Sequence, residues 1–349
     1  MRAMVLCAGL GTRLRPITNL WPKPAVPLLG APLLRYALAT LQAAGVSEVG
    51  INTHHLPEVM EGVARAECER AHLRLTVSHE AGEIQGTGGG IRGLADFLRG
   101  GDFAVLNGDV LFALELGPVL EAHRKSGAAA TMVLLPMPEG ERFNAVEVDA
   151  SGAVRRIAGQ GPGGERLTSW HFSGVHVMTP AVFDFMAASG PEDINRDVYP
   201  RMIAKGLTVR AHVLADRAAY WSDLGSPPRY AATHRHLLFG QAKMERFGAV
   251  SPFSAPRGEG NFWAHPTAQL ADVRVAGPAW FGERCVLERG VRIGAAVSVG
   301  PGAHVGADTH LNRVAVLDGA RVPAGRLIED AIVFGDGQVV ATGEVPSGA

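Results

Sequence analysis

The chain has 349 residues, which exceeds one ordinary domain of roughly 100–200 residues, so two domains are expected. Hydrophobic residues make up 47% and charged residues 19%, which excludes wholesale disorder. The formal net charge of −1 excludes a surface built to coat nucleic acid or an anionic membrane, so neither is expected as a partner.

The cysteines and the apolar pattern indicate a cytoplasmic protein. Cys7, Cys68 and Cys285 are widely spaced and form no disulfide framework, which suits a reducing compartment. We expect neither a signal peptide nor a transmembrane helix, because no apolar run has the required length and flanks.

The first 240 or so residues alternate strand-like and helix-like segments. Strands are predicted at residues 2–6, 48–52, 73–78 and 103–106, and helices at 32–44, 57–70 and 89–98. This rhythm predicts a mostly parallel sheet with helices on both faces, and ligands bound outside the carboxyl ends of its strands.

From residue 144 the pattern becomes richer in strands. A hairpin is predicted at 144–148 and 153–157, a helix at 193–204, and strands at 171–178, 208–213 and 220–223. We expect this half to extend the same domain and to form the second wall of a cleft.

The C-terminal segment carries a six-residue repeat of apolar anchors. The anchors are Val275, Phe281, Leu287, Ile293, Val299, Val305, Leu311 and Leu317, and after one deletion Val322, Ile328, Phe334 and Val340. This period predicts a hexapeptide parallel β-helix of about four coils rather than a β-sandwich. We therefore expect a first domain at residues 1–240, a linker at 241–262 and a β-helix domain at 263–343.

The strongest motif follows the first strand. It runs from Leu6 to Leu14 as Leu-Cys-Ala-Gly-Leu-Gly-Thr-Arg-Leu, and Pro-Lys-Pro follows at 22–24. Backbone N–H groups of such a loop bind phosphate oxygens, Arg13 can hold a polyphosphate with two hydrogen bonds, and Lys23 adds a point charge. The spacing fits neither a Walker A motif nor a dinucleotide fingerprint, so a generic glycine turn remains an alternative on the residues alone.

This motif resembles the signature of the sugar-1-phosphate nucleotidylyltransferases, also called NDP-sugar pyrophosphorylases. The resemblance covers residues 1 to about 238, and an appended hexapeptide β-helix is common in that family. It implies a Rossmann-like α/β fold of the nucleotide-diphospho-sugar transferase type, followed by a left-handed β-helix. It also implies a nucleotide site, including a base-recognition turn at 86–90, formed by Leu6, Ala8, Gly9, Gly11, Thr12, Arg13, Gly86, Thr87 and Gly108.

The resemblance further implies the reaction and its catalytic groups. An NTP and a sugar 1-phosphate would give an NDP-sugar and pyrophosphate, with Arg13 and Lys23 placing the phosphates. Asp109 and Asp223 resemble the two carboxylates that hold Mg²⁺ in the family. The implied sugar-binding residues are Asn144, Ser173 and Gly174.

The chain departs from the family where many relatives carry Glu-Lys-Pro beside the sugar phosphate. Here the stretch at 157–160 is Ile-Ala-Gly-Gln, and Arg155 or Arg156 is a candidate substitute for the lysine. In having Phe-Ser-Gly at 172–174 and in lacking Glu-Lys-Pro, the chain resembles the N-acetylmuramate-1-phosphate uridylyltransferases. The two-domain layout resembles mannose-1-phosphate guanylyltransferases.

Two alternatives to a simple transferase remain open. One is a non-catalytic NDP-sugar-binding subunit that regulates a catalytic homologue. The other is a bifunctional enzyme with an acyltransferase β-helix, using His304 or His310. We expect the β-helix to join subunits of a homo-oligomer. His54 and His55 are adjacent, so they are poor metal co-ligands, and Cys7 is expected to be an apolar filler rather than a nucleophile.

Overall fold

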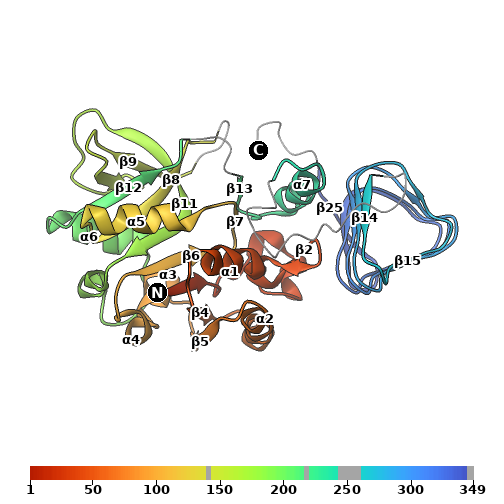
Figure 1. The fold of residues 1–349 in the computed structure, drawn as a ribbon, viewed down its shortest axis with the longest axis horizontal. Helices are drawn as coiled ribbons and strands as arrows, with labels where there is room; N and C mark the ends of the chain where they lie inside the picture. Colours follow the sequence, from red (N-terminus) through yellow and green to blue (C-terminus); the bar gives the residue numbers. More distant parts are fainter. Residues whose placement is uncertain (139–142, 216–219, 243–260, 344–349) are drawn as a thin grey trace.

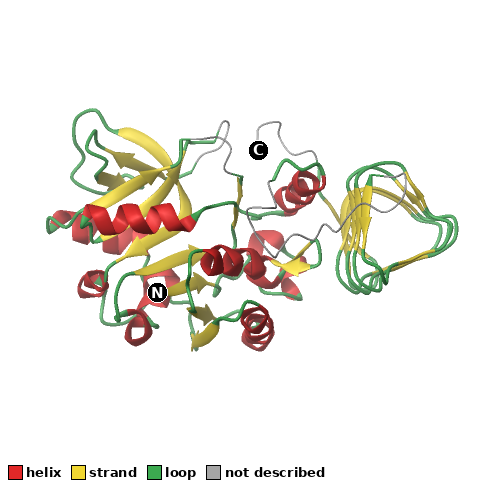
Figure 2. Ribbon diagram, in the orientation of Figure 1, coloured by secondary structure: helices red, strands yellow, loops and turns green. Residues whose placement is uncertain are grey.

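The computed structural model describes residues 1–138, 143–215, 220–242 and 261–343 (Figure 1). A sheet covered by helices occupies one end of the molecule, and a triangular coil of short strands occupies the other (Figure 2). The residues between them, at 243–260, lie outside the described chain, as does most of the predicted linker.

A nine-stranded mixed sheet forms the framework of the first part. Its first half is parallel and contains β1 (Arg2–Leu6), β4 (Glu48–Thr53), β5 (Arg74–His79) and β6 (Phe103–Asn107). Strand β11 (Thr168–Met178) runs antiparallel to β6 and joins this half to β8 (Ala130–Leu135), β9 (Ala145–Val148), β10 (Val154–Ile157) and β12 (Val209–Val213). The predicted α/β class, with a strand-rich second half, is confirmed.

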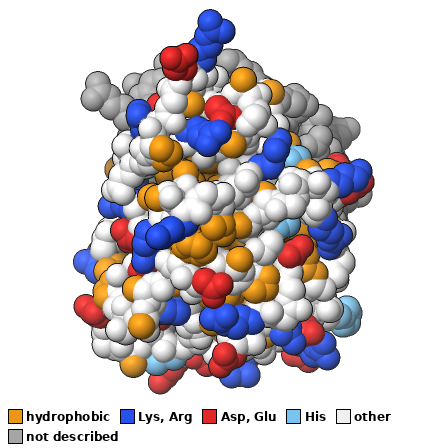
Figure 3. Space-filling view, turned by 90° about the vertical axis from the view of Figure 1, so that its left-hand side faces the viewer, with side chains coloured by type: hydrophobic (Ala, Val, Ile, Leu, Met, Phe, Trp, Pro, Cys, Tyr) orange, Lys and Arg blue, Asp and Glu red, His pale blue; other side chains and the backbone are white. Residues whose placement is uncertain are grey.

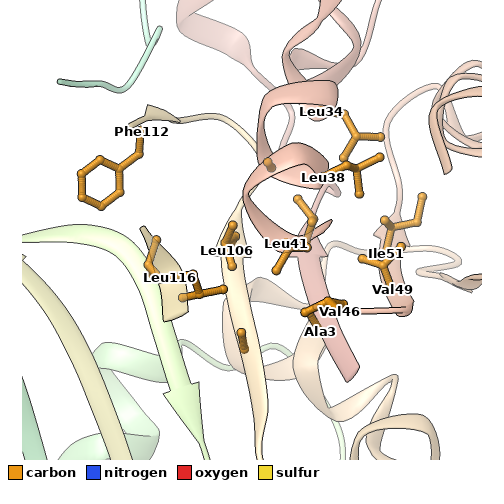
Figure 4. Packing of buried hydrophobic residues seen from close by; sticks show 14 of the residues in the cluster. Ala3, Leu34, Leu38, Leu41, Val46, Val49, Ile51, Leu106, Phe112 and Leu116 are labelled. Carbon is orange, nitrogen blue, oxygen red and sulfur yellow. The ribbon is translucent and has the colours of Figure 1, made fainter. Parts of the chain in front are cut away.

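Helices cover both faces of this sheet. One face packs against α1 (Leu33–Ala43), α2 (Pro57–Arg70) and α5 (Leu116–Ser126), and the other against α3 (Gly86–Arg92), α4 (Ala95–Leu98) and α6 (Tyr199–Ala204). On α1 the apolar residues Leu34, Leu38 and Leu41 recur at helical spacing and lie beside Val49 and Leu106 of the sheet (Figure 4). These contacts fix the strand ends from which the candidate site is built.

Two predicted helices are wrong in detail. The segment 89–98 forms two helices rather than one, and the first of them, α3, starts earlier, at Gly86. Helix α3 ends before Gly93, which packs so closely on β5 that a Cβ would lie 2.8 Å from Ser78 Oγ. The segment 193–204 begins as a π-helical turn, η5 (Ile194–Val198), before α6 continues it. Pro200, which has no N–H to donate, sits near the start of α6.

The C-terminal strands stack in parallel as a β-helix. One face is the four-stranded sheet of β15 (Gln269–Leu270), β18 (Val286–Leu287), β21 (His304–Val305) and β23 (Arg321–Val322). The other strands of the coils are β14 (Phe262–Ala264), β16 (Arg274–Val275), β17 (Ala279–Phe281), β19 (Arg292–Ile293), β20 (Val297–Val299), β22 (His310–Val316) and β24 (Leu327–Phe334), with β25 (Gln338–Ala341) antiparallel to β24.

Most of the repeated anchors fill the interior of this coil. Phe281, Leu287, Val299 and Leu311 are fully buried there. Glycine often follows an anchor because successive coils come very close: a Cβ on Gly282 would lie 2.6 Å from the backbone nitrogen of Pro301. The predicted β-helix is therefore confirmed, whereas the exact domain limits stay a prediction.

The β-helix packs on the first part through an apolar interface. Helix α7 (Pro227–Leu238) lies against β22 and β24. Trp280 points out of the coil, and a Cβ on Gly30 would lie 2.5 Å from its ring. The shared cluster also contains Leu28, Leu29, Tyr230, Leu237, Ala315, Leu317, Ile332 and Phe334. The two parts are thus held by a continuous core, and Ser298 Oγ and His234 Nδ1 add a buried hydrogen bond of 3.0 Å.

Asp318 gives this interface a pH dependence. Burial raises the pKa of its carboxyl to about 7, and the nearby Arg35 guanidinium opposes that shift. Between the ordinary value of 3.8 and about 7 the carboxyl is protonated in the folded state and ionised in the unfolded state. The free energy of unfolding therefore falls by roughly 1.4 kcal/mol per pH unit in this window.

We expect Asp318→Asn to remove this pH-dependent loss of stability. Urea unfolding should show a larger gain in stability for the variant at about pH 8 than at about pH 5, because the loss is complete above the folded-state pKa. An equal gain at both pH values would contradict this account of Asp318.

The surface at the end away from the β-helix mixes both signs of charge. Lys and Arg lie among Asp and Glu, with apolar side chains between them (Figure 3). Within the described residues, no helix is long and apolar enough to span a membrane.

Candidate active site

The main pocket has a volume of about 410 Å³ and opens at the carboxyl ends of β1 and β6. Its lining residues are Leu6, Ala8, Gly9, Leu10, Gly11, Thr12, Arg13, Lys23, Pro24, Asn52, Ile84, Gly86, Thr87, Asn107, Asp109 and Gly225. All but one of the predicted nucleotide-binding residues are among them. Gly108 lies behind the wall instead, where its N–H donates to Leu6 O at 3.0 Å.

The glycine loop forms one wall of this pocket. A Cβ added to Gly9 would meet nothing within 4 Å, so packing does not require glycine there and the position is open to a ligand. Gly11 has a φ of +60° and accepts a hydrogen bond from Thr18 Oγ1 at 2.9 Å. The loop is therefore pinned at Gly11 and open at Gly9, as a phosphate-binding turn requires.

Lys23 connects the two predicted metal-binding aspartates. Its Nζ donates to Asp109 Oδ2 at 2.9 Å and to the backbone carbonyl of Asp223 at 2.8 Å. The lysine side chain is 7% exposed, whereas that of Asp109 is 42% exposed. The ammonium group is thus fixed at the floor of the pocket, with one carboxylate facing its opening.

Arg13 joins this group from the glycine loop. A Cβ on Gly225 would lie 3.0 Å from both Arg13 Nη2 and Asp223 Oδ2, so these two groups flank the same glycine. Asp223 follows β13 (Trp221–Ser222) and also accepts a hydrogen bond from Arg229. Three of the four predicted catalytic residues, Arg13, Lys23 and Asp109, therefore line the pocket, whereas Asp223 does not line it and lies beside them at Gly225.

The carboxylates fit a metal ion that is shared with a ligand. Among the residues the structure describes, no group of three or more His, Cys, Asp or Glu side chains could form a complete protein cage. Mg²⁺ is commonly held by one or two carboxylates together with substrate phosphates and water. Asp109 and Asp223 match that donor set.

A buried polar network, which the sequence analysis missed, supports the same pocket. Asn52 Oδ1 accepts from Cys7 N at 2.8 Å, and its Nδ2 donates to Glu80 Oε1 at 2.7 Å. The second oxygen of Glu80 accepts from Gln85 N at 2.8 Å. The network therefore ties the glycine loop to the turn at Gly86, and Asn52 itself lines the pocket.

We expect Asn52→Ala to lower the free energy of unfolding by about 1–3 kcal/mol, because it leaves two buried polar groups without partners. Urea unfolding measures this, with the exposed Asn19→Ala as the matched control. Equal stability of the two variants would contradict a structural role for the network.

The turn at Gly86 is held by the segment before η5. Gly86 has a φ of +70°, and a Cβ there would lie 2.5 Å from Glu192 O. The Thr87 hydroxyl donates to Asp193 Oδ2 at 3.2 Å and accepts from Ile194 N at 2.9 Å. Thr87, which lines the main pocket, is therefore bonded to Asp193, which lines a second pocket.

The second pocket has a volume of about 210 Å³. It is lined by Phe143, Asn144, Val146, Ile157, Ala158, His171, Phe172, Asp193, Asn195 and Arg196. Of the predicted sugar-binding residues, only Asn144 lines it. Ser173 and Gly174 line a smaller cavity with Tyr36 and Asn107, and the Ser173 hydroxyl donates to Val133 O at 2.8 Å.

The arginines suggested as substitutes for the missing lysine point elsewhere. Arg155 pairs with Asp149, and Arg156 lies 3.3 Å from Glu147. Neither lines the main or the second pocket, whereas Arg196 lines the second.

The adjacent histidines have separate partners, and Cys7 is buried in the core. His54 Nδ1 lies 3.0 Å from Glu80 O, and His55 Nε2 lies 2.7 Å from Thr18 O, so the two rings turn to different neighbours. Cys7 is buried in the core, and burial raises the pKa of its thiol, as expected for an apolar filler.

Comparison with known proteins identifies the family. The model described as nucleotidyl transferase matches residues 2–239. The chain belongs to the nucleotidyl transferase family. The resemblance seen in the glycine loop is thereby confirmed, and so is the assignment of the chain as an enzyme of this class.

Several curated relatives align with most of the length of this nucleotidyltransferase. A UTP–glucose-1-phosphate uridylyltransferase of Synechocystis is 27% identical, over 98% of this chain and 89% of that protein. A mannose-1-phosphate guanylyltransferase of Mycobacterium tuberculosis is 31% identical, over 94% and 82%. Mannose-1-phosphate guanylyltransferase 1 of Arabidopsis thaliana is 29% identical, over 84% and 80%.

Proposed function

We propose that this nucleotidyltransferase joins an NTP to a sugar 1-phosphate, giving an NDP-sugar and pyrophosphate. The observation that carries the proposal is that Arg13, Lys23 and Asp109 line the main pocket, with Asp223 beside them at Gly225. The names of the relatives support the same reaction, since each transfers a nucleotide to a sugar 1-phosphate.

The residues of the pocket act by position and charge. The glycine loop binds the phosphates of the NTP, and Arg13 and Lys23 stabilise the charge that develops on the departing pyrophosphate. A sugar-phosphate oxygen attacks the α-phosphorus in line, so no covalent enzyme intermediate is required. Asp109 and Asp223 would hold Mg²⁺, which would neutralise charge at the reacting phosphates.

The relatives differ in both base and sugar, so we propose two candidate substrate pairs. The M. tuberculosis and A. thaliana relatives favour GTP with mannose 1-phosphate. Phe-Ser-Gly at 172–174 and the missing Glu-Lys-Pro favour UTP with a hexosamine or N-acetylmuramate 1-phosphate. A cytoplasmic location and a homo-oligomer formed through the β-helix stay predictions.

The missing lysine of Glu-Lys-Pro favours a second candidate function, a subunit that binds NDP-sugar and regulates a catalytic homologue. Retention of Arg13, Lys23 and both aspartates argues for the enzyme, because a sensor does not need metal ligands.

Pyrophosphate release with Mg²⁺ distinguishes the two candidates. The matrix crosses GTP, UTP, dTTP, CTP and ATP with the 1-phosphates of mannose, glucose, N-acetylglucosamine and N-acetylmuramate. One active combination is expected. No release in any combination, together with NDP-sugar binding by calorimetry, would support the regulatory subunit instead.

A further inference from the structure

His171 is a buried histidine for which the described part of the chain supplies no hydrogen-bond partner. His171 is 4% exposed, and neither nitrogen of its imidazole ring has a partner among the described residues. The ring is held by Phe143, with centroids 4.2 Å apart, and by Trp221, edge-on at 4.5 Å. A buried polar group in this position needs a partner from water or a ligand.

The other buried histidines do not share this property. His123 Nδ1 lies 2.8 Å from Thr131 Oγ1, His176 Nδ1 lies 2.7 Å from the Tyr199 hydroxyl, and His234 Nδ1 pairs with Ser298. Each of these rings is therefore fixed by the protein itself. His176 is the closest comparison because it lies on the same strand, β11, but does not line the second pocket.

The second pocket holds another unpartnered group. Asn195 Oδ1 is buried and has no hydrogen-bond partner within the described chain, and Asn195 lines the same pocket as His171. The remaining wall combines apolar residues, such as Val146, Ile157 and Phe172, with the polar Asn144, Asp193 and Arg196. A pocket in which polar groups converge between apolar side chains is typical of a site that orients a small polar ligand.

The position of this pocket points to the sugar rather than the base. His171 packs on Trp221, two residues before Asp223, whereas Asp193 connects another part of the pocket to Thr87, beside the turn at Gly86. The proposed reaction requires the sugar ring to lie next to the carboxylates. The base would lie at the other end of the nucleotide, beside the turn at Gly86.

We propose that His171 is a sugar-recognition residue, whose imidazole hydrogen-bonds a hydroxyl or amide group of the sugar 1-phosphate in the second pocket. Whichever nitrogen carries the proton, the ring offers an N–H donor. Asn195 Oδ1 accepts a hydrogen bond from the same ligand. This inference rests on the proposed function and names residues that select the sugar.

Steady-state kinetics of His171→Phe test the proposal, because phenylalanine keeps an aromatic ring but loses both nitrogens. We expect the KM for the sugar 1-phosphate to rise roughly 10- to 100-fold, with the KM for the NTP unchanged. His171→Gln should restore part of the loss. His176→Phe is the matched control, and it should leave the KM for the sugar 1-phosphate unchanged.

Deoxy analogues of the best sugar 1-phosphate add a readout that a structural role would not change. The wild-type enzyme should discriminate against one analogue, and His171→Phe should lose that discrimination, because the group that reads the missing hydroxyl is gone. An active wild type with unchanged KM and discrimination in His171→Phe would overturn this inference alone. A wild type that releases no pyrophosphate with any sugar phosphate would overturn the proposed function and the inference together.

Discussion

Arg13→Ala is expected to lower kcat roughly 10²- to 10³-fold while leaving the unfolding transition unchanged. The guanidinium lines the main pocket, lies close to Asp223 across Gly225, and belongs to an exposed residue, so its loss removes charge without disturbing the core. Pyrophosphate release and urea unfolding of the same preparation measure the two effects.

Arg15→Ala is the matched control for this experiment. Arg15 is also exposed and belongs to the same segment, but it does not line the main pocket. We expect it to retain wild-type turnover. Wild-type rates in Arg13→Ala, or equal losses in both variants, would show that Arg13 does not act on the phosphates.

Trp280→Ala is expected to lower the free energy of unfolding by about 3–5 kcal/mol. The side chain is 7% exposed and fills the contact between the β-helix and the segment around Gly30, so its removal leaves a cavity in the core shared by both parts. Urea unfolding monitored by far-UV circular dichroism measures the change.

Leu327→Ala is the control for Trp280→Ala. Leu327 is also an apolar residue of the β-helix, but it is 70% exposed, so a change within about 0.5 kcal/mol is expected. If Trp280→Ala were as mild as Leu327→Ala, the interface would contribute little to stability and the two parts would fold independently.

Periodicity predicted the regular parts of the fold. Helix α2 has the predicted bounds, and β1 ends at Leu6 as expected, because the apolar spacing and the flanking proline or glycines are local signals. The six-residue anchors likewise predicted the β-helix. Local signals did not predict α5, β8 or α7, nor the break between α3 and α4, which depends on close packing of Gly93 against another strand.

The grouping of Arg13, Lys23, Asp109 and Asp223 could be expected from the sequence, because each lies in a short continuous motif. The supporting residues were not, since Asn52 and Glu80 come together only when β4 and β5 pair. Both lie near the carboxyl ends of parallel strands, which was the available signal. The interface between the two parts was not predicted either, because Trp280 and Ile332 come together with residues of the first part only in the folded chain.

Phosphorus NMR of the complete reaction tests the central claim most directly. The wild-type protein, Mg²⁺, and the NTP and sugar 1-phosphate of the most active combination are followed until the sugar phosphate is consumed. The account predicts one NDP-sugar and one pyrophosphate for each sugar 1-phosphate consumed. The resonance of the sugar 1-phosphate should not reappear. Release of inorganic phosphate from the NTP, without formation of an NDP-sugar, would contradict it.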